Sequence, residues 1–106
     1  MDVVSVTVPI TISLSGAIGI AAGGSHTCAL MMNHGLKCWG NNSNGQIGDN
    51  TQTARPVPVN VLFMSSGVAA VTGGGLHTCA LTNSNAVWCW GLINTASWVM
   101  ALIIRA

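Results

Sequence analysis

Hydrophobic and polar positions alternate along much of this chain with the two-residue period of β-strands. In residues 4–13, β-branched residues alternate with serine and threonine around Pro9, which predicts one strand or two short ones. Residues 17–22 form a short apolar run of the kind expected for a fully buried strand. Gly23 and Gly24 end this run, and they would let the backbone turn sharply or approach a neighbouring element closely.

A hairpin is predicted next, with strands at residues 26–31 and 36–39 and a turn at residues 32–35. Alternate side chains of a strand share one face of the sheet. Cys28 can therefore face Cys38 across this hairpin.

A long polar segment follows the hairpin. Residues 40–55 are mostly glycine, asparagine, serine and threonine, which predicts a loop with a tight turn at Asn44 and Gly45. Alternation resumes in residues 56–61, whose prolines suit a strand at the edge of a sheet.

The pattern then repeats at a constant offset of 51 positions. Residues 23–40 read GGSHTCALMMNHGLKCWG, and residues 74–91 read GGLHTCALTNSNAVWCWG. The second copy has its own short apolar run at residues 68–72 and its own turn at residues 83–85. A period of about 50 residues is typical of stacked or radial arrays, in which one repeat cannot bury its own apolar faces.

The repeat divides the chain into four expected segments. They are the end of a preceding repeat at 1–16, a first repeat at 17–67, a truncated second repeat at 68–91, and an unmatched apolar tail at 92–106. The second repeat is expected to lack both its long loop and its outer strand. The spacing of the tail fits either a short helix or a strand.

Composition limits the classes of partner. Charged residues make up 5% of the chain, against about 25% in average soluble domains. Three scattered lysines and arginines do not form the basic groove that nucleic acids need, so no nucleic-acid partner is expected. The apolar tail is shorter than the roughly 20 residues of a membrane-spanning helix. The first residues lack the basic start of a secretory signal.

Four cysteines form two equally spaced pairs, Cys28 with Cys38 and Cys79 with Cys89. One local disulfide per repeat is the favoured interpretation, and it implies an oxidising compartment. A zinc site using His26, Cys28 and Cys38 is an alternative, but structural zinc sites use four ligands and commonly a CxxC pair, which is absent. Free buried thiols are expected instead if the protein stays in a cytoplasm.

Four motifs in order resemble the regulator of chromosome condensation repeat family. They are Gly-Gly-x-His-Thr-Cys-Ala-Leu at 23–30, Cys-Trp-Gly at 38–40, Asn-x-x-Gly-Gln-Ile-Gly at 42–48, and Pro-Val-x-Val at 58–61. The resemblance implies an all-β fold, a β-propeller of about seven four-stranded blades. Some one and a half repeats would supply one to two antiparallel blades, hence a partial propeller. Such a piece needs further repeats or self-association to cover its faces.

The paired cysteines are similar to those of secreted or cell-surface bacterial members, so an extracellular or cell-surface location is expected. Trp39 and Trp90 are expected to pack between adjacent blades. In the family, loops like residues 41–53 protrude and contact partners. The expected contact residues here are Asn41, Asn42, Asn44, Gln46 and Asp49.

The resemblance implies a non-catalytic protein-protein interaction module with no metal or cofactor, in which His26 and His77 are structural. Guanine nucleotide exchange on a small GTPase is an alternative that rests on the family alone, and β-lactamase inhibition is another family activity that works by protein contact. A hydrolase using His26 or His77 with a cysteine thiol is a further alternative, because histidine beside cysteine is how thiol nucleophiles are activated. A repeated position is more often architectural, so no catalytic residue is expected.

Overall fold

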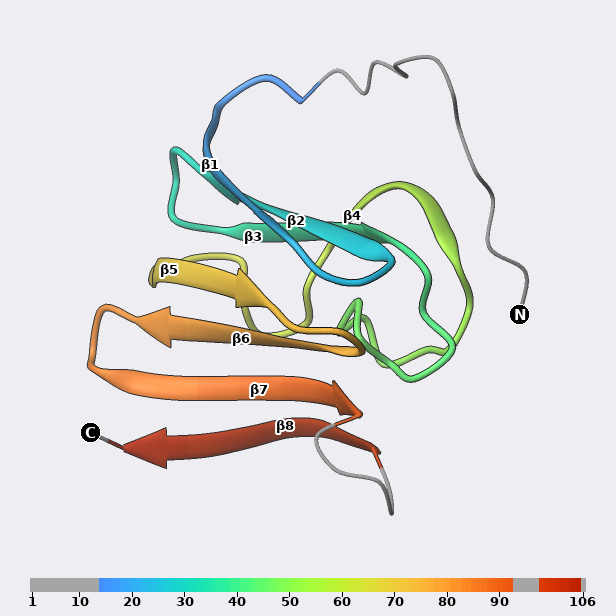
Figure 1. Cartoon of the computed structure of the whole chain (residues 1–106). Helices are drawn as coiled ribbons and strands as arrows, with labels where there is room; N and C mark the ends of the chain where they lie inside the picture. Colours follow the sequence, from blue (N-terminus) through green and yellow to red (C-terminus); the bar gives the residue numbers. More distant parts are fainter. Residues whose placement is uncertain (1–13, 93–97, 106) are drawn as a thin grey trace.

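The computed structural model describes residues 14–92 and 98–105, and these residues form two four-stranded antiparallel sheets (Figure 1). The strands of the first sheet are β1 (Ala17–Ala22), β2 (His26–Met31), β3 (Leu36–Gly40) and β4 (Arg55–Asn60). Those of the second sheet are β5 (Val68–Gly73), β6 (His77–Thr82), β7 (Ala86–Leu92) and β8 (Trp98–Arg105). Each sheet pairs its strands in chain order. The all-β prediction is confirmed for the described residues.

The hairpins of the two sheets turn in the same way. The N–H of His34 donates to the Met31 carbonyl at 2.8 Å, and the N–H of Asn85 donates to the Thr82 carbonyl at 3.0 Å. His34 and Asn85 both have a positive φ, of 64° and 67°. The two predicted turns are therefore confirmed, and they share one backbone geometry.

Apolar side chains from both sheets meet between them in one core. Strand alternation turns Cys28 and Leu30 of β2 toward the second sheet, where Val68 and Ala80 complete the contact. The other buried members of this core are Leu36, Cys38, Ile47, Val61, Met64 and Trp90. Because the core lies between the sheets, neither sheet buries its apolar surface alone, as the repeat period predicts.

Glycines allow the two sheets to touch where β1 and β5 end. The N–H of Gly24 donates to the carbonyl of Gly74 at 3.0 Å. A Cβ at Gly23 would lie 2.7 Å from that same carbonyl oxygen, and a Cβ at Gly24 would lie 2.5 Å from the carbonyl oxygen of Gly75. The predicted close approach of the backbone at these glycines is confirmed.

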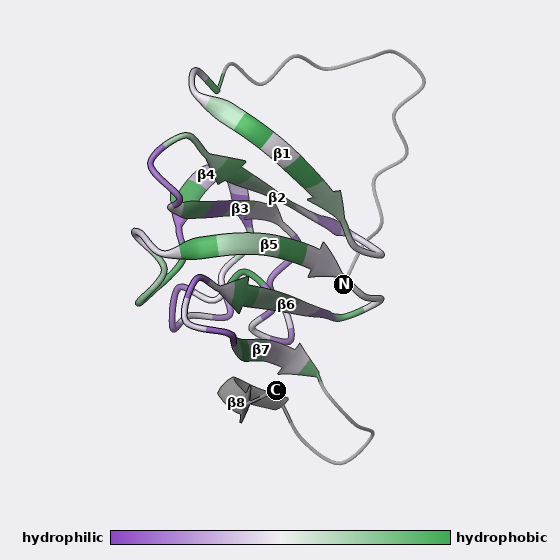
Figure 2. Ribbon diagram, turned by 90° about the vertical axis from the view of Figure 1, so that its left-hand side faces the viewer, coloured by the Kyte–Doolittle hydropathy of each residue, from purple (hydrophilic) through white to green (hydrophobic). Residues whose placement is uncertain are grey.

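The prediction that residues 17–22 are fully buried is wrong. β1 forms there, but Ile18 is 57% exposed and Ile20 is 73% exposed. Figure 2 shows hydrophobic positions along β1, at the edge of the first sheet. β5 is also only partly buried. An apolar run of this kind is typical of a strand that is covered on both sides. The described residues cover β1 on only one side, so its apolar side chains stay exposed.

The second sheet does have an outer strand, so the prediction that it lacks one is wrong. β8 forms within the apolar tail and pairs with β7 over most of its length. The choice between helix and strand is therefore resolved as strand. The long loop is missing as predicted, because residues 41–54 connect β3 to β4 whereas only residues 93–97 connect β7 to β8. The strand expected within residues 4–13 lies outside the described residues.

Candidate functional site

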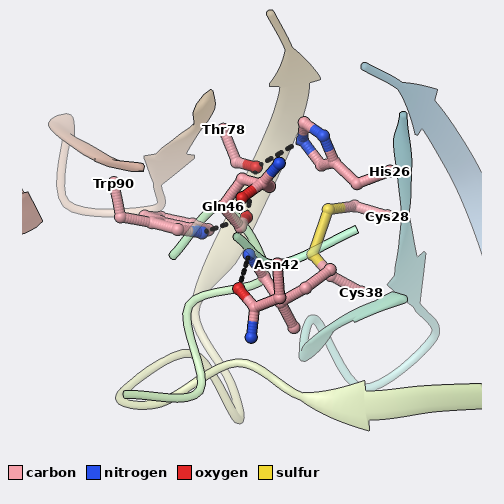
Figure 3. The surroundings of a disulfide bond; sticks show 8 residues. His26, Cys28, Cys38, Asn42, Gln46, Thr78 and Trp90 are labelled. Atoms are coloured by element: carbon pink, nitrogen blue, oxygen red, sulfur yellow. Dashed lines mark hydrogen bonds between the residues drawn. A yellow bond between two sulfur atoms is a disulfide. The ribbon is translucent and has the colours of Figure 1, made fainter. Parts of the chain in front are cut away.

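The loop of residues 41–54 reaches from the first sheet onto the second and closes the seam between them (Figure 3). The backbone carbonyl of Gln46 accepts two hydrogen bonds there, from Thr78 Oγ1 at 2.7 Å and from Trp90 Nε1 at 2.9 Å. Gln46 and Thr78 are fully buried, and Trp90 is 2% exposed. One carbonyl oxygen has two lone pairs, so this single atom satisfies both donors of the second sheet.

His26 completes the seam from the first sheet. Its Nε2 lies 2.8 Å from Thr78 Oγ1. Because the threonine hydroxyl gives its one hydrogen to the Gln46 carbonyl, the hydrogen shared with His26 must belong to Nε2. The other ring nitrogen, Nδ1, is buried and has no hydrogen-bond partner among the described residues, as suits an unprotonated nitrogen.

The environment of His26 disfavours a positive charge. Burial lowers the pKa of this imidazole below its ordinary value and is the largest effect. The His77 backbone raises the pKa in part, and the proximity of the His77 ring lowers it by a smaller amount. His26 is therefore a neutral donor that joins two sheets, and this supports the structural role expected for it.

Gly48 lets the loop lie flat on the indole of Trp90. A Cβ at Gly48 would lie 2.6 Å from Trp90 Nε1, and the φ of Gly48 is +80°. Both the contact and the backbone conformation require glycine. The predicted place of Trp90 between adjacent sheets is confirmed, and the loop is the element it packs against.

Buried hydrogen bonds of Asn42 hold the loop in shape. The side-chain carbonyl of Asn42 accepts from the N–H of Ile47 at 3.0 Å. Its amide nitrogen lies 2.9 Å from the Thr53 carbonyl and 3.1 Å from Asp49 Oδ1. Asn42 is fully buried, and its bond with Ile47 is buried, whereas its bonds with Thr53 and Asp49 are part-buried. They fix the loop from residue 42 to residue 53.

An ion pair closes the same loop at its base. Arg55 Nε donates to Asp49 Oδ2 at 2.6 Å. Burial by itself would raise the pKa of Asp49, but hydrogen bonds from Thr51, Arg55 and Asn42 outweigh it and hold this pKa below its ordinary value. The single carboxylate of the loop is thus used inside the protein.

The five expected contact residues do not form one exposed patch. Asn42 and Gln46 are fully buried, so no partner can reach their side chains in this conformation. Asn41, Asn44 and Asp49 are half-buried. The exposed polar side chains of the loop are those of Ser43, Asn50, Gln52 and Thr53.

Disulfides join both cysteine pairs. Cys28 and Cys38 face each other directly across β2 and β3, and Cys79 and Cys89 do so across β6 and β7. With its sulfurs bonded to each other, neither pair offers the thiolate that a zinc site or a nucleophile needs. The zinc and hydrolase alternatives are therefore wrong for this oxidised state.

Trp39 occupies the place in the first sheet that Trp90 occupies in the second. It is only half-buried, and none of the described residues accepts a hydrogen bond from its indole. None of the described residues forms a second sheet against Trp39, so its expected position between blades stays a prediction.

Sequence reasoning did not identify the Gln46 carbonyl as the acceptor of the seam. The signal available was the Gln-Ile-Gly motif beside a repeated His-Thr pair, but a backbone atom leaves no direct mark in a sequence.

In the part of the chain that the structure describes, no three histidine, cysteine or acidic residues cluster as metal ligands would. The same part holds no helix long and apolar enough to cross a membrane.

Comparison with protein families identifies the repeat. Two family models, both described as the regulator of chromosome condensation (RCC1) repeat, match residues 17–46 and 68–96 in one case and residues 37–81 in the other. The chain belongs to the RCC1 repeat family. RCC1 repeats are in general non-catalytic.

The curated relatives are much longer than this chain. The ultraviolet-B receptor UVR8 of Arabidopsis thaliana is 34% identical over 73 residues, which are 68% of this chain and 17% of that protein. The human probable E3 ubiquitin-protein ligase HERC4 is 36% identical over 74 residues, which are 68% of this chain and 7% of that protein. This chain therefore corresponds to a small part of either relative.

Solved structures show the same fold. Human WBSCR16 matches with a TM-score of 0.74 at 17% identity, over 90% of this chain and 27% of that one. Prp20p of Saccharomyces cerevisiae, which binds Gsp1p and histones, matches with a TM-score of 0.72 at 20% identity. That match also covers 90% of this chain and 27% of the other. These are RCC1-like β-propellers, so the prediction of a partial β-propeller is confirmed. The two sheets are two adjacent blades.

Proposed function

We propose that this chain is a non-catalytic protein-protein interaction module that works as part of a larger RCC1 propeller outside the cytoplasm. The carrying observation is the loop of residues 41–54, which the hydrogen bonds of the buried Asn42 side chain hold in one shape. A rigid loop loses little conformational entropy when a partner binds, so its exposed polar groups can contribute affinity directly.

The contact surface that we propose differs from the one expected from the sequence. It consists of Ser43, Asn50, Gln52 and Thr53, the exposed side chains of the loop, with Asn41, Asn44 and Asp49 at its margin. Asn42 and Gln46 support this surface from beneath. Apart from the Asp49 carboxylate, which pairs with Arg55, its groups are neutral hydrogen-bond donors and acceptors, which suit the polar surface of a protein better than a phosphate backbone.

Membership of a larger propeller is supported by the exposed apolar face of β1. Ile18 and Ile20 are more than half exposed although β1 is an apolar strand. A further blade on this side would cover Ile20, because its counterpart in the second blade, Val71, is partly buried against the core between the two blades. We therefore propose that the chain works as two blades of a larger propeller.

An extracellular or cell-surface location is supported by both disulfides. They occur at the same place in each blade, and cytosolic conditions keep such thiols reduced. Guanine nucleotide exchange on a small GTPase stays an expectation from the family, since no contact among the described residues favours it over other protein partners.

Cross-linking tests the contact surface. The oxidised chain is incubated with the extracellular fraction of its source organism and compared with a variant carrying Asn50→Ala, Gln52→Ala and Thr53→Ala. The matched control carries Asn83→Ala and Ser84→Ala in an exposed turn of the second blade. We expect a discrete cross-linked partner with the native chain and the control, but not with the loop variant. Identical products from all three would contradict the proposal.

A further inference from the structure

A hollow of about 470 Å³ opens at the end of the first blade where β2 turns into β3. Its lining comes from three segments that lie far apart in the sequence, which are residues 15–16, 31–37 and 60–65. The N–H of Leu36 donates to the Met64 carbonyl at 2.8 Å, so the last two segments are held together by their backbones. The volume falls in the range of about 300 to 1,000 Å³ that ligand pockets occupy. We call this site the hairpin hollow.

Hydrogen-bond donors gather in the polar part of the hairpin hollow. The ammonium of Lys37 donates to Asn60 Oδ1 at 2.7 Å in an exposed bond. An ammonium has three donors, so two of them are left for a ligand. The hydroxyls of Ser15 and Ser65 line the same hollow. Among the described residues, none of those that line the hollow is acidic, and no carboxylate forms an ion pair with Lys37.

Methionine and leucine side chains form the apolar part of the hairpin hollow. Leu36 is 1% exposed and Met31 is 8% exposed, whereas Met32 is 69% exposed. A Cβ at Gly16 would lie 3.9 Å from both Met31 Cε and Met32 Sδ, so the two thioether side chains reach the same place. Thioethers are flexible and polarizable, and they adapt to apolar groups of different shapes.

The repeat itself does not require these residues. Residues 26–30 and 38–40 of the first copy recur unchanged in the second copy. Between them, the positions of Met31, Met32 and Lys37 carry threonine, asparagine and tryptophan in the second copy. The ammonium and the thioethers are therefore particular to the first blade, and a blade forms without them.

Phe63 adds an exposed aromatic ring in the turn between two lining residues, Asn60 and Ser65. The N–H of Met64 donates to the Val61 carbonyl at 3.1 Å, which closes a turn with Phe63 at its third position. Phe63 has a φ of 66° and is 74% exposed. A left-handed φ at this position suits glycine and is unusual for a bulky side chain. Neither the backbone nor the packing of the described residues favours phenylalanine here, which points to a contact outside the chain.

We propose that the hairpin hollow binds the C-terminus of a polypeptide that ends in an apolar residue. Lys37 and the neighbouring hydroxyls bind the carboxylate, and the apolar part of the hollow holds the last side chain. Phe63 contacts the residues that precede it. One lysine matches the single charge of a carboxylate, whereas a phosphate group carries more charge than one lysine neutralises. The proposal rests on the proposed function as an interaction module, but it uses a different surface from the loop of residues 41–54.

Peptide titration followed by NMR of the oxidised chain tests the proposal. The probes are acetylated tetrapeptides that end in leucine, valine or phenylalanine, each made with a free C-terminus and with a C-terminal amide. The free acids should shift the backbone signals of residues 31–37 and 60–65. They should bind at least about fivefold more tightly than the amides, and added salt should reduce this difference. Equal affinities of acids and amides, or no binding of any acid, would overturn the proposal.

Variants of the lining residues locate the contact. Lys37→Met keeps the apolar stem but removes the charge, and it should abolish the preference for the acid, whereas Lys37→Arg should retain it. Met32→Ala should weaken the acid and the amide alike, by about twofold to fivefold. Asn83→Ala is the matched control in the equivalent turn of the second blade and should change neither affinity. A preference for the acid that survives Lys37→Met would contradict the proposed site.

Phe63→Gly separates peptide contact from folding. Glycine adopts the left-handed φ without strain, so the urea midpoint of this variant should be unchanged or higher. Its affinity for the tetrapeptides should fall by about threefold to fivefold, while its affinity for acetyl-leucine should match that of the native chain. Acetyl-leucine that binds the native chain as tightly as the tetrapeptides would identify a small free acid as the ligand and would overturn the proposal.

Circular dichroism and a count of free thiols establish that each variant is folded and oxidised. The loop-surface alanines used above should leave peptide binding unchanged. Lys37→Met should leave the cross-linked partner of the loop unchanged. The two proposals can therefore fail separately.

Discussion

Thr78 Oγ1 donates to the backbone carbonyl of Gln46 at 2.7 Å, across the boundary between two propeller blades. The two residues come from different repeats, and both are fully buried. One hydroxyl and one carbonyl thus link the loop of the first blade to the central part of the second. The stability of the chain should depend on this link more than on any single contact at its surface.

Replacing Thr78 by valine tests that dependence. Thr78→Val keeps the shape of the side chain but removes the donor to Gln46 and the acceptor for His26 Nε2. We expect the free energy of unfolding, measured by urea denaturation, to fall by about 1 to 3 kcal/mol. Thr27 is the equivalent residue of the first blade and is only half-buried, so Thr27→Val should alter the free energy of unfolding by less than about 0.5 kcal/mol. Equal effects of the two substitutions would contradict the role of Thr78 in joining the two blades.

Gly48 and Gly67 form a matched pair of glycines. Their φ values are +80° and +78°, but a Cβ at Gly48 would meet the Trp90 indole whereas a Cβ at Gly67 would meet nothing within 4 Å. Alanine at either position should cost about 1 to 2 kcal/mol for the backbone conformation. Gly48→Ala should cost about 1 to 3 kcal/mol more, because it overpacks the seam. Urea denaturation of both variants measures the difference, and Gly67→Ala is the control.

The two disulfides should be present in the isolated protein. Thiol titration of the denatured, unreduced chain should detect no free thiol, because all four sulfurs are paired. Replacing Cys28 and Cys38 together by alanine should lower the free energy of unfolding by about 2.5 to 3 kcal/mol, the value for a short closed loop. Four free thiols in the native protein would contradict both the pairing and the proposed compartment.

Stability should fall in mild acid because of His26. Burial lowers the pKa of His26 in the folded state below its ordinary value of 6.5, which the unfolded chain retains. Below about that pH the unfolded state binds more protons than the folded state, so the free energy of unfolding rises with pH in this window. The stabilisation from neutral His26 should be fully present above the pKa of 6.5 that His26 has in the unfolded chain. It should be lost as the pH falls through the lower pKa that His26 has in the folded protein.

The control for this pH dependence is His26→Gln, which keeps a side-chain N–H donor but does not titrate. Urea denaturation of both proteins across this pH range should show a smaller slope for the variant. An unchanged slope would mean that His26 is not the group responsible.

The strands and turns could be predicted from the sequence because their causes are local. Period-two alternation predicts β2 and β3, and it also predicts that Cys28 faces Cys38, which the disulfide confirms. The repeated glycines predicted a close backbone approach, which Gly24 and Gly74 make. These signals depend on neighbouring residues along the chain, and the sequence contains them directly.

The exposure of β1, the outer strand β8 and the role of Gln46 could not be predicted, because each depends on what lies across space. Ile18 and Ile20 read as buried since apolar character does not show which neighbour is present. The tail of the chain fits two periods, and pairing with β7 selects the strand. Gln46 acts through its main chain, so its side chain gave no sign of the acceptor.

The indole protons of Trp90 and Trp39 provide the most direct test of the seam. In solution NMR, the Trp90 Nε1 proton should exchange slowly with water and show a nuclear Overhauser effect to the α-protons of Gly48, because that indole is buried under the loop. The Trp39 proton, in the same repeat position but half-buried, should exchange much faster. Equally fast exchange of both protons, with no contact between Trp90 and Gly48, would contradict the adjacent blades and the loop that joins them.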